Sequence, residues 1–252
     1  MSGHSKWSTI KHQKGVADVR KGQLFTKLAR EIAVAVRQEG GNVESNFRLR
    51  LAIQKARDQS MPMDNIERAV KRAVGGGDTQ EQFDEITYEG YGPGGVALMV
   101  QALTSNRNRT ASDVRAVLSH GGGSMGEAGC VSWNFESRGV LTLTVDTGQA
   151  DDVALLAIDA GAEDFNAEGG FIEIYTRPEH LEAVRRELET RGMVISTAEV
   201  SMVPKQEVPL TPGQAEKTLR LLDALEELAD VQKVYTNADF PEAVLESYQR
   251  EG

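Results

Sequence analysis

The spacing of apolar residues changes at Gly75-Gly76-Gly77, and this change constrains the fold more than any other feature of the chain. Before these glycines, apolar residues recur every three or four positions, which is the period of an amphipathic helix. After them, short runs typical of β-strands separate the helical segments. The glycine run itself indicates a helix end followed by a linker. We therefore expect a helical N-terminal part and a longer α/β part.

Three helices are predicted before the glycines. The first covers residues 22–39, with an apolar stripe at Leu24, Leu28, Ile32 and Val36. The second covers residues 45–59, with Ser45 as its N-cap. The third begins at Asp64, and Glu67 three residues later gives a pair resembling a capping box. Three amphipathic helices in so short a segment predict a small helical bundle, and we place this domain at residues 1–77.

Strands and a helix are predicted next, over residues 78–137. Residues 86–91 and 96–103 form a predicted hairpin around a Gly-Pro-Gly-Gly turn. Residues 109–120 are a predicted helix, and residues 130–135 a further strand. The polar run Glu136-Ser137-Arg138-Gly139 is expected to end that strand.

The remaining elements suggest that one module is inserted in another. Residues 138–204 follow the order β-α-β-β-α-β, which is typical of a ferredoxin-like module. A leucine-rich helix and a strand at residues 231–235 follow, and they have no partners unless they complete the earlier sheet. We therefore predict a discontinuous α/β domain of residues 78–137 plus 205–240. The expected fold class is α+β and multi-domain, with an N-terminal helical bundle followed by two α/β ferredoxin-like modules, one inserted in the other.

Positive charge is concentrated in the helical part. Residues 1–76 contain 15 Lys and Arg against 7 Asp and Glu, a net charge of +8. Residues 77–252 contain 13 against 31, a net charge of −18. A chain divided in this way offers one region to a polyanion and repels it with the other. The basic region is interpreted either as a phosphate-binding surface or as a solvated helical surface rich in lysine.

The densest part of this basic region is residues 1–30. Its candidate nucleic-acid-binding residues are Lys6, Trp7, Lys11, His12, Lys14, Arg20, Lys21, Lys27 and Arg30. The cations would contact phosphate oxygens, and Trp7 would stack on a base or pack within the protein.

A second basic group, Asn106-Arg107-Asn108-Arg109-Thr110, interrupts the acidic part. It lies where a predicted strand leads into a helix, so Asn108 or Thr110 could simply cap that helix. Arginine and asparagine also offer donors of fixed geometry to phosphate or RNA. Both interpretations stay open, and Arg107 and Arg109 join the candidate residues.

Two glycine-rich stretches match the dinucleotide motif G-x-G-x-x-G, at Gly90-Gly92-Gly95 and Gly121-Gly123-Gly126. Such a site needs a strand before the glycines and a helix after them. The first match is followed by a strand, and the second follows a helix. The G-x-S-x-G at residues 122–126 also lacks the strand-to-helix turn of a nucleophile elbow. We expect these glycines in a hairpin turn and at a helix end.

The sequence contains no recognised metal-binding or catalytic motif. There is no Cys-x-x-Cys, HExxH or calcium-loop spacing, and no pair of carboxylates is placed for acid–base catalysis. We expect no metal, no cofactor and no enzymatic activity. A single cysteine, Cys130, is typical of a reducing compartment. No apolar run approaches the roughly 20 residues of a membrane span, and no secretory signal is recognised, so a cytoplasmic location is expected.

Several longer strings of residues are more specific than any of these motifs. Near the N-terminus they are Gly3-His4-Ser5-Lys6-Trp7, Lys11-His12 and Phe25-Thr26-Lys27-Leu28. Further along they are Tyr88-Glu89-Gly90-Tyr91-Gly92-Pro93-Gly94-Gly95, Asn106-Arg107-Asn108-Arg109-Thr110, Ala160-Gly161-Ala162-Glu163-Asp164 and Glu199-Val200-Ser201-Met202-Val203-Pro204. In this order they resemble the YebC family over essentially the whole chain. The resemblance implies a helical domain and two α/β domains, and it supplies no catalytic residues. Bacterial members are described as probable DNA-binding transcriptional regulators, and mitochondrial relatives are translational activators.

The expected function is therefore a cytoplasmic regulator that binds DNA through its basic N-terminal domain. The alternative is a ribosome-associated translation factor that contacts ribosomal RNA, because the acidic body suits a protein that brings only one end to a nucleic acid. The acidic α/β part is expected to contact protein partners. The oligomeric state is left open.

Overall fold

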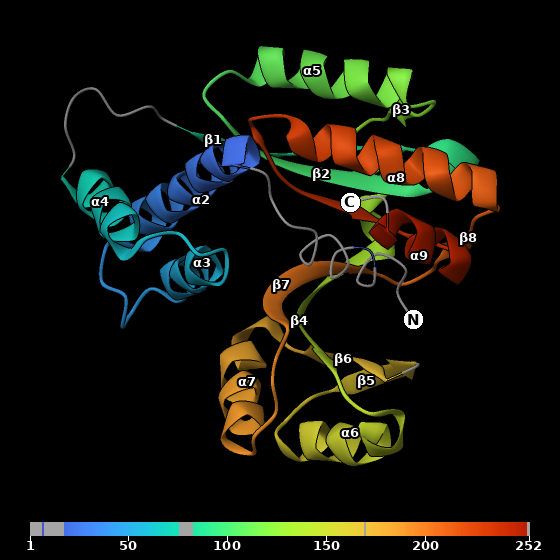
Figure 1. Ribbon diagram of the computed structural model, residues 1–252. Coiled ribbons are helices and arrows are strands. Elements are labelled where there is room, and N and C mark those ends of the chain that lie inside the picture. Colours follow the sequence, from blue (N-terminus) through green and yellow to red (C-terminus); the bar gives the residue numbers. More distant parts are fainter. Residues whose placement is uncertain (1–6, 8–17, 76–82, 169, 251–252) are drawn as a thin grey trace.

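The computed structural model describes residues 7, 18–75, 83–168 and 170–250. Figure 1 shows a helical module on the left, a sheet covered by two long helices at the upper right, and a second sheet with two helices below. This arrangement confirms the predicted α+β fold class, with the helices first and the two sheets after them.

The helical module consists of α2 (Asp18–Glu39), α3 (Phe47–Asp58) and α4 (Met63–Val74). Its core includes the predicted stripe of α2, with Leu28, Ile32 and Val36 packed against Leu49 and Ile66. Since the charged residues of α2 lie off this stripe, the helix can bury its apolar face and leave its cations available for other contacts.

The N-cap of α3 is Asn46, and the prediction of Ser45 is wrong by one residue. The Asn46 Oδ1 atom accepts a hydrogen bond of 2.8 Å from the amide of Leu49. Its Nδ2 atom donates to the carbonyl oxygens of Ala35 and Gly40, at 2.8 and 2.7 Å. One buried amide therefore caps α3 and fastens it to the end of α2.

The first sheet has the strand order β3-β1-β2-β9, with every neighbouring pair antiparallel. Its strands are β1 (Asp84–Tyr91), β2 (Ala97–Thr104), β3 (Ser124–Met125) and β9 (Val231–Thr236). Leu98 and Val100 face the core beneath α5 (Arg107–His120) and α8 (Pro212–Glu227), whereas Ala97 and Met99 face the other side. The β1–β2 turn contains Gly94 and Gly95 at φ +79° and +78°, as expected of hairpin glycines.

The second sheet has the strand order β5-β6-β4-β7. Its strands are β4 (Phe135–Thr144), β5 (Asp164–Glu168), β6 (Phe171–Thr176) and β7 (Thr197–Pro204). The helices α6 (Ala150–Asp159) and α7 (Leu181–Thr190) cover one face, where they bury Leu141, Leu143, Ile172 and Ile174. Both the chain order and the strand order are ferredoxin-like. The first sheet differs in connectivity, because its two inner strands are consecutive and form a hairpin.

The strand β9 pairs with β2, with Val100 opposite Val234, and so belongs to the first sheet. Residues 138–204 lie in the chain between the two parts of that sheet. The two ends of this segment are neighbours, because Phe135 lies opposite Pro204. These pairings support a discontinuous domain with residues 138–204 inserted, which we retain as our proposal for the domain boundaries.

Two local predictions are wrong. Residues 130–135 do not form a strand of the first sheet, since Ser132–Asn134 is a short 3₁₀ helix. The polar run at residues 136–139 does not end a strand either, because β4 passes through it. At residues 136–138, before the pairing with β6 begins at Gly139, β4 pairs with β7 alone, and such a two-stranded ribbon tolerates polar side chains.

The C-terminal part adds elements that were not predicted. The strands β8 (Val208–Pro209) and β10 (Ala238–Asp239) form a short parallel pair. The helix α9 (Glu242–Arg250) buries Val244 and Leu245 against the core of the first sheet. This helix therefore completes that core.

Candidate nucleic-acid interface

The proposed basic surface lies where α2 meets the module of the first sheet. The two meet at Asp230, in the loop between α8 and β9. The Arg30 NH1 atom lies 3.0 Å from Asp230 Oδ1, and the Arg109 NH2 atom lies 2.6 Å from Asp230 Oδ2. Two candidate cations from separate modules therefore share one carboxylate. Arg30 of α2 and Arg109 of α5 are therefore neighbours.

Asp230 is held firmly, with only 8% of its side chain exposed. The hydroxyl groups of Thr104 and Thr110 donate to Oδ2 at 3.2 and 2.8 Å. Burial alone would raise the pKa of Asp230, but the hydrogen bonds from Arg109 and Thr110 and the charges of Arg109 and Arg30 outweigh it. The pKa is therefore below its usual value, and the carboxylate is charged at neutral pH.

Two of the candidate side chains, one lysine and one arginine, hold α2 against the module of the first sheet. The Lys27 Nζ atom donates to the carbonyl oxygen of Glu226 at 2.5 Å, and Arg30 NH1 donates to that of Ala229 at 2.9 Å. These carbonyls lie at and just beyond the C-terminal end of α8, where the helix dipole favours cations. Because both head groups bind protein atoms, we do not count Lys27 and Arg30 among the proposed phosphate contacts.

The arginines of α5 are more accessible. The N-cap of α5 is Asn106, whose Oδ1 atom accepts from the amide of Arg109 at 3.1 Å, so neither Asn108 nor Thr110 is the cap. The side chains of Arg107 and Arg109 are 67% and 53% exposed. Arg107 Nε donates to Asp84 at 2.8 Å, and this bond is the main reason that the pKa of Asp84 is lowered. Each guanidinium is thus oriented by a carboxylate, and its exposed position makes it accessible to a phosphate.

The remaining candidates are only partly described. Lys21 lies exposed near the start of α2. Arg20 belongs to α2, but its side chain lies outside the described residues. Lys6, Lys11, His12 and Lys14 also lie outside the described residues. For these residues, phosphate binding stays a prediction from the sequence.

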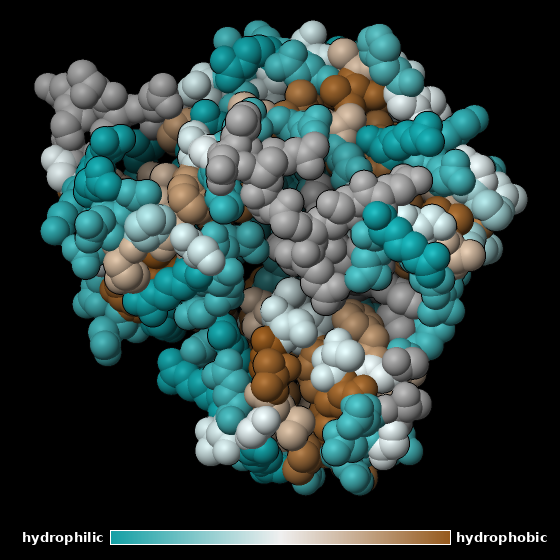
Figure 2. Space-filling view, in the orientation of Figure 1, coloured by the Kyte–Doolittle hydropathy of each residue, from teal (hydrophilic) through white to brown (hydrophobic). Residues whose placement is uncertain are grey.

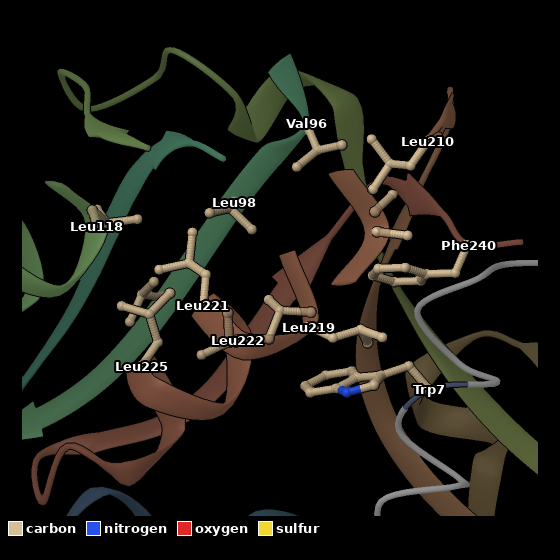
Figure 3. Close-up of a cluster of buried hydrophobic side chains, with 14 of the residues drawn as sticks. Trp7, Val96, Leu98, Leu118, Leu210, Leu219, Leu221, Leu222, Leu225 and Phe240 are labelled. Carbon is tan, nitrogen blue, oxygen red and sulfur yellow. The ribbon is translucent and has the colours of Figure 1, made fainter. Parts of the chain in front are cut away.

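Trp7 is 1% exposed and belongs to the core beneath α8. Figure 3 shows its indole ring in a cluster with Leu219 and Phe240. A ring buried in this way cannot stack on a base, so we correct the assignment and remove Trp7 from the candidate contacts. A large apolar ring is as well suited to packing in a protein core as it is to stacking on a base.

Sequence reasoning missed Asp230 and Thr104. Neither lies in a recognisable motif, and Asp230 lies in a short connection between a helix and a strand, where an acidic residue is usually solvated. Only the pairing of β9 with β2 brings Asp230 beside the start of α5. The one sequence signal was indirect, namely the concentration of hydrogen-bonding residues at positions 104–110.

The rest of the described surface is divided by polarity. Arg68, Lys71 and Arg72 lie exposed on α4. Figure 2 shows apolar residues gathered on the lower module, which includes the exposed side chains of Leu155, Ile158, Phe165 and Val194.

Within the described residues, no three His, Cys, Asp or Glu side chains are placed to hold a metal ion. No helix in that part of the chain combines the length and apolar character of a membrane span.

The sequence matches known domains over nearly its full length. Residues 5–76 match the TACO1/YebC protein N-terminal domain, and residues 83–238 match the TACO1/YebC second and third domain. The chain belongs to the TACO1/YebC family. This confirms the resemblance seen in the sequence.

Curated members of the TACO1/YebC family that resemble this chain are named probable transcriptional regulatory proteins. One from Dehalococcoides mccartyi is 54% identical over 249 residues, covering 98% of each chain. One from Roseiflexus castenholzii is 52% identical, covering 98% of this chain and 99% of its own. The crystal structure of a conserved hypothetical protein from Aquifex aeolicus has a TM-score of 0.81 at 46% identity, covering 92% of this chain and 96% of that one. These names support a regulatory role.

Proposed function

We propose that this protein is a non-enzymatic regulator of transcription that binds DNA through its basic N-terminal domain and the adjoining start of α5. The observation that carries the proposal is the meeting of Arg30 and Arg109 at Asp230, which joins the two basic segments of the sequence. The proposed contacts are Lys6, Lys11, His12, Lys14, Arg20, Lys21, Arg107 and Arg109. The names of the relatives favour DNA over other polyanions.

The test is the affinity for duplex DNA as a function of salt concentration. If about five phosphates are neutralised, the logarithm of the association constant should fall with the logarithm of salt concentration at a slope of about −4.5. The triple variant Lys11→Glu, Lys14→Glu, Lys21→Glu should abolish binding. Arg107→Gln should weaken binding and make the slope shallower by about 1.

The matched control is the triple variant Arg68→Glu, Lys71→Glu, Arg72→Glu. It makes the same change in net charge on the exposed face of α4, which Figure 1 shows far from α5. It should reduce affinity much less than the first triple variant. Equal losses would mean that overall charge and not the proposed surface determines binding, and unchanged affinity of the first variant would refute the proposal.

A second candidate, docking on ribosomal RNA, is favoured by the net charge of −18 on residues 77–252. An acidic body is repelled by a long duplex but tolerated where only one end approaches RNA. Sedimentation of tagged protein from gently lysed cells separates the two. Migration with ribosomes that survives DNase and is lost in the Lys11/Lys14/Lys21 variant would replace DNA by RNA. Discrete chromatin immunoprecipitation peaks, with the protein remaining at the top of the gradient, would support DNA.

A further inference from the structure

The three modules enclose a cavity of about 370 Å³ at the centre of the molecule. Its walls are the facing sides of α2 and α3, the strands β2 and β9 of the first sheet, and β7 of the second sheet. Figure 1 shows these three modules arranged around one centre. The volume lies in the range of about 300–1,000 Å³ typical of small-molecule sites, which often occur where domains meet.

Most charged groups around the cavity are already paired. Lys233 Nζ donates to Glu199 Oε2 and to the carbonyl oxygen of Val200, both at 2.9 Å. Arg48 donates through Nε and NH2 to Glu31 at 3.1 and 3.0 Å, and through NH1 to Glu85 at 3.0 Å. Two cations therefore pair with three carboxylates.

Lys55, on the cavity side of α3, is different. Among the described residues, no carboxylate or other acceptor lies within hydrogen-bonding distance of its ammonium. Burial lowers its pKa, as does the charge of Lys233, and the more distant carboxylates of Glu199, Glu31 and Glu226 offset this only in part. Lys233 shows the contrast, because its contact with Glu199 outweighs burial and raises its pKa.

A second donor in the wall lacks an acceptor. The Nε2 atom of Gln232 is buried and has no hydrogen-bond partner within the described part of the chain. A buried donor left unpaired is unfavourable, and more so when the group is charged. These two donors without an acceptor among the described residues, Lys55 Nζ and Gln232 Nε2, could serve an acceptor-bearing, negatively charged group, while Leu51, Ala102 and Met202 offer apolar surface beside them.

We infer that this cavity is a binding site for a small organic anion with an apolar body, whose anionic group pairs with the ammonium of Lys55. The amide nitrogen of Gln232 donates to a further acceptor of the ligand, and the apolar body lies against the strand residues of the wall. This site does not rest on the proposed binding of nucleic acid. It does connect to that surface, because Leu28 and Glu31 of α2 line the cavity while Lys27 and Arg30 of the same helix hold α8.

The experiment uses two fluorescent probes of nearly the same shape with the full chain. One is 8-anilinonaphthalene-1-sulfonate, and the other is N-phenyl-1-naphthylamine, which lacks the sulfonate. The sulfonate probe should bind at one site per chain. Lys55→Met should weaken its binding about tenfold while changing the affinity for the neutral probe less than about twofold. Lys55→Arg, which keeps the charge, should retain most of the affinity.

Lys71→Met is the matched control, because Lys71 is an exposed lysine on α4. Equal affinities of the Lys55→Met and Lys71→Met variants for the sulfonate probe, or binding without saturation at one site, would overturn the inference. The Lys55→Met variant should fold, since it replaces an unpaired, partly desolvated charge with an apolar chain of similar length.

Chemical labelling gives an independent readout on the unaltered protein. At saturation, the sulfonate probe should slow acetylation of Lys55 by acetic anhydride about fivefold or more and leave Lys71 unchanged, as followed by mass spectrometry of peptides. Equal labelling of Lys55 with and without the probe would mean that the cavity holds only solvent, and would also overturn the inference.

Discussion

Asp230 connects parts of the chain that lie far apart in the sequence. It receives Arg30 from α2, Arg109 from α5 and two threonine hydroxyls. Exposed ion pairs contribute little to stability, but removing a buried carboxylate leaves its donors without an acceptor. This residue is therefore expected to matter both for stability and for the arrangement of the basic surface.

Asp230→Asn should lower the free energy of unfolding by about 1–3 kcal/mol at neutral pH, because Arg30 and Arg109 lose the negative charge with which both pair. Urea denaturation measures this. Asp84→Asn is the control, since Asp84 pairs with a mostly exposed arginine and should affect stability less. A larger loss in the control would contradict the structural role given to Asp230.

The stabilities of the wild type and of Asp230→Asn should depend differently on pH. The pKa of Asp230 is lowered on folding, so its contribution is fully present above the unfolded value of about 3.9 and is lost as pH falls through the folded value. The difference in stability between the wild type and Asp230→Asn should be constant above about pH 5 and shrink below about pH 4. A difference that instead grew on acidification would contradict the assignment.

Trp7 and Trp133 are the two tryptophans of the chain and lie in opposite environments. Trp7→Ala should lower the free energy of unfolding by about 3–5 kcal/mol, because it empties part of the core beneath α8. Trp133 is 64% exposed, and Trp133→Ala should change stability by less than about 0.5 kcal/mol. Chemical denaturation of both variants checks this. A Trp7→Ala variant of full stability but weakened DNA binding would restore Trp7 as a contact residue.

At the scale of elements, the carboxylate of Glu89 determines the conformation of the segment before β4. It accepts hydrogen bonds from the amides of Gly129, Val131 and Ser132, at 2.8, 2.7 and 2.9 Å. Backbone donors used in this way cannot join a strand ladder, which explains why the apolar residues at 130–135 do not extend the first sheet. Burial alone would raise the pKa of Glu89, and the three amide donors outweigh it and lower the pKa.

Glu89→Gln should destabilise the protein by about 2–4 kcal/mol, because an amide offers one acceptor oxygen where the carboxylate offers two. Hydrogen exchange should show the first losses of protection at residues 129–132. Glu127→Gln, in the same loop, serves as the control and should leave exchange nearly unchanged. Equal protection in the Glu89→Gln variant would show that the loop does not depend on this carboxylate.

The whole molecule has a chain path that leaves the first sheet after β3 and returns before β9. The ends of the intervening segment are neighbours, since Arg138 lies opposite Ser201 in the β4–β7 pair. The second sheet has its own core of aliphatic residues beneath α6 and α7. The two sheets are thus expected to fold around separate cores.

Excision of residues 139–200 tests this organisation. Joining Arg138 to Ser201 through Asn-Gly creates a two-residue hairpin of favoured geometry, so the remaining chain should fold and unfold cooperatively. Circular dichroism and thermal unfolding measure the outcome. The same deletion without the Asn-Gly turn is the control and should be less stable. If both chains were unfolded, the proposed discontinuous domain would not be independent of the inserted one.

The sequence predicted the features that depend on local periodicity. The stripe of α2 at Leu28, Ile32 and Val36 was identified because an amphipathic helix buries one face in any fold that accepts it. The order β-α-β-β-α-β at residues 138–204 was recognisable for the same reason. Helix ends were less accurate, as at Asn46, because a cap is selected by its partners at Ala35 and Gly40 as well as by its residue type.

The amino-acid sequence is enough to predict the division into helical and strand-bearing parts, the concentration of positive charge in the first 76 residues and membership of the TACO1/YebC family. The folded arrangement was needed to show that Trp7 is core, that Lys27 and Arg30 hold the end of α8, and that Lys55 faces a cavity without a partner among the described residues. The physical reason is that periodicity and net charge are properties of neighbouring residues. The burial and partners of a side chain depend instead on segments that meet only after the chain has folded.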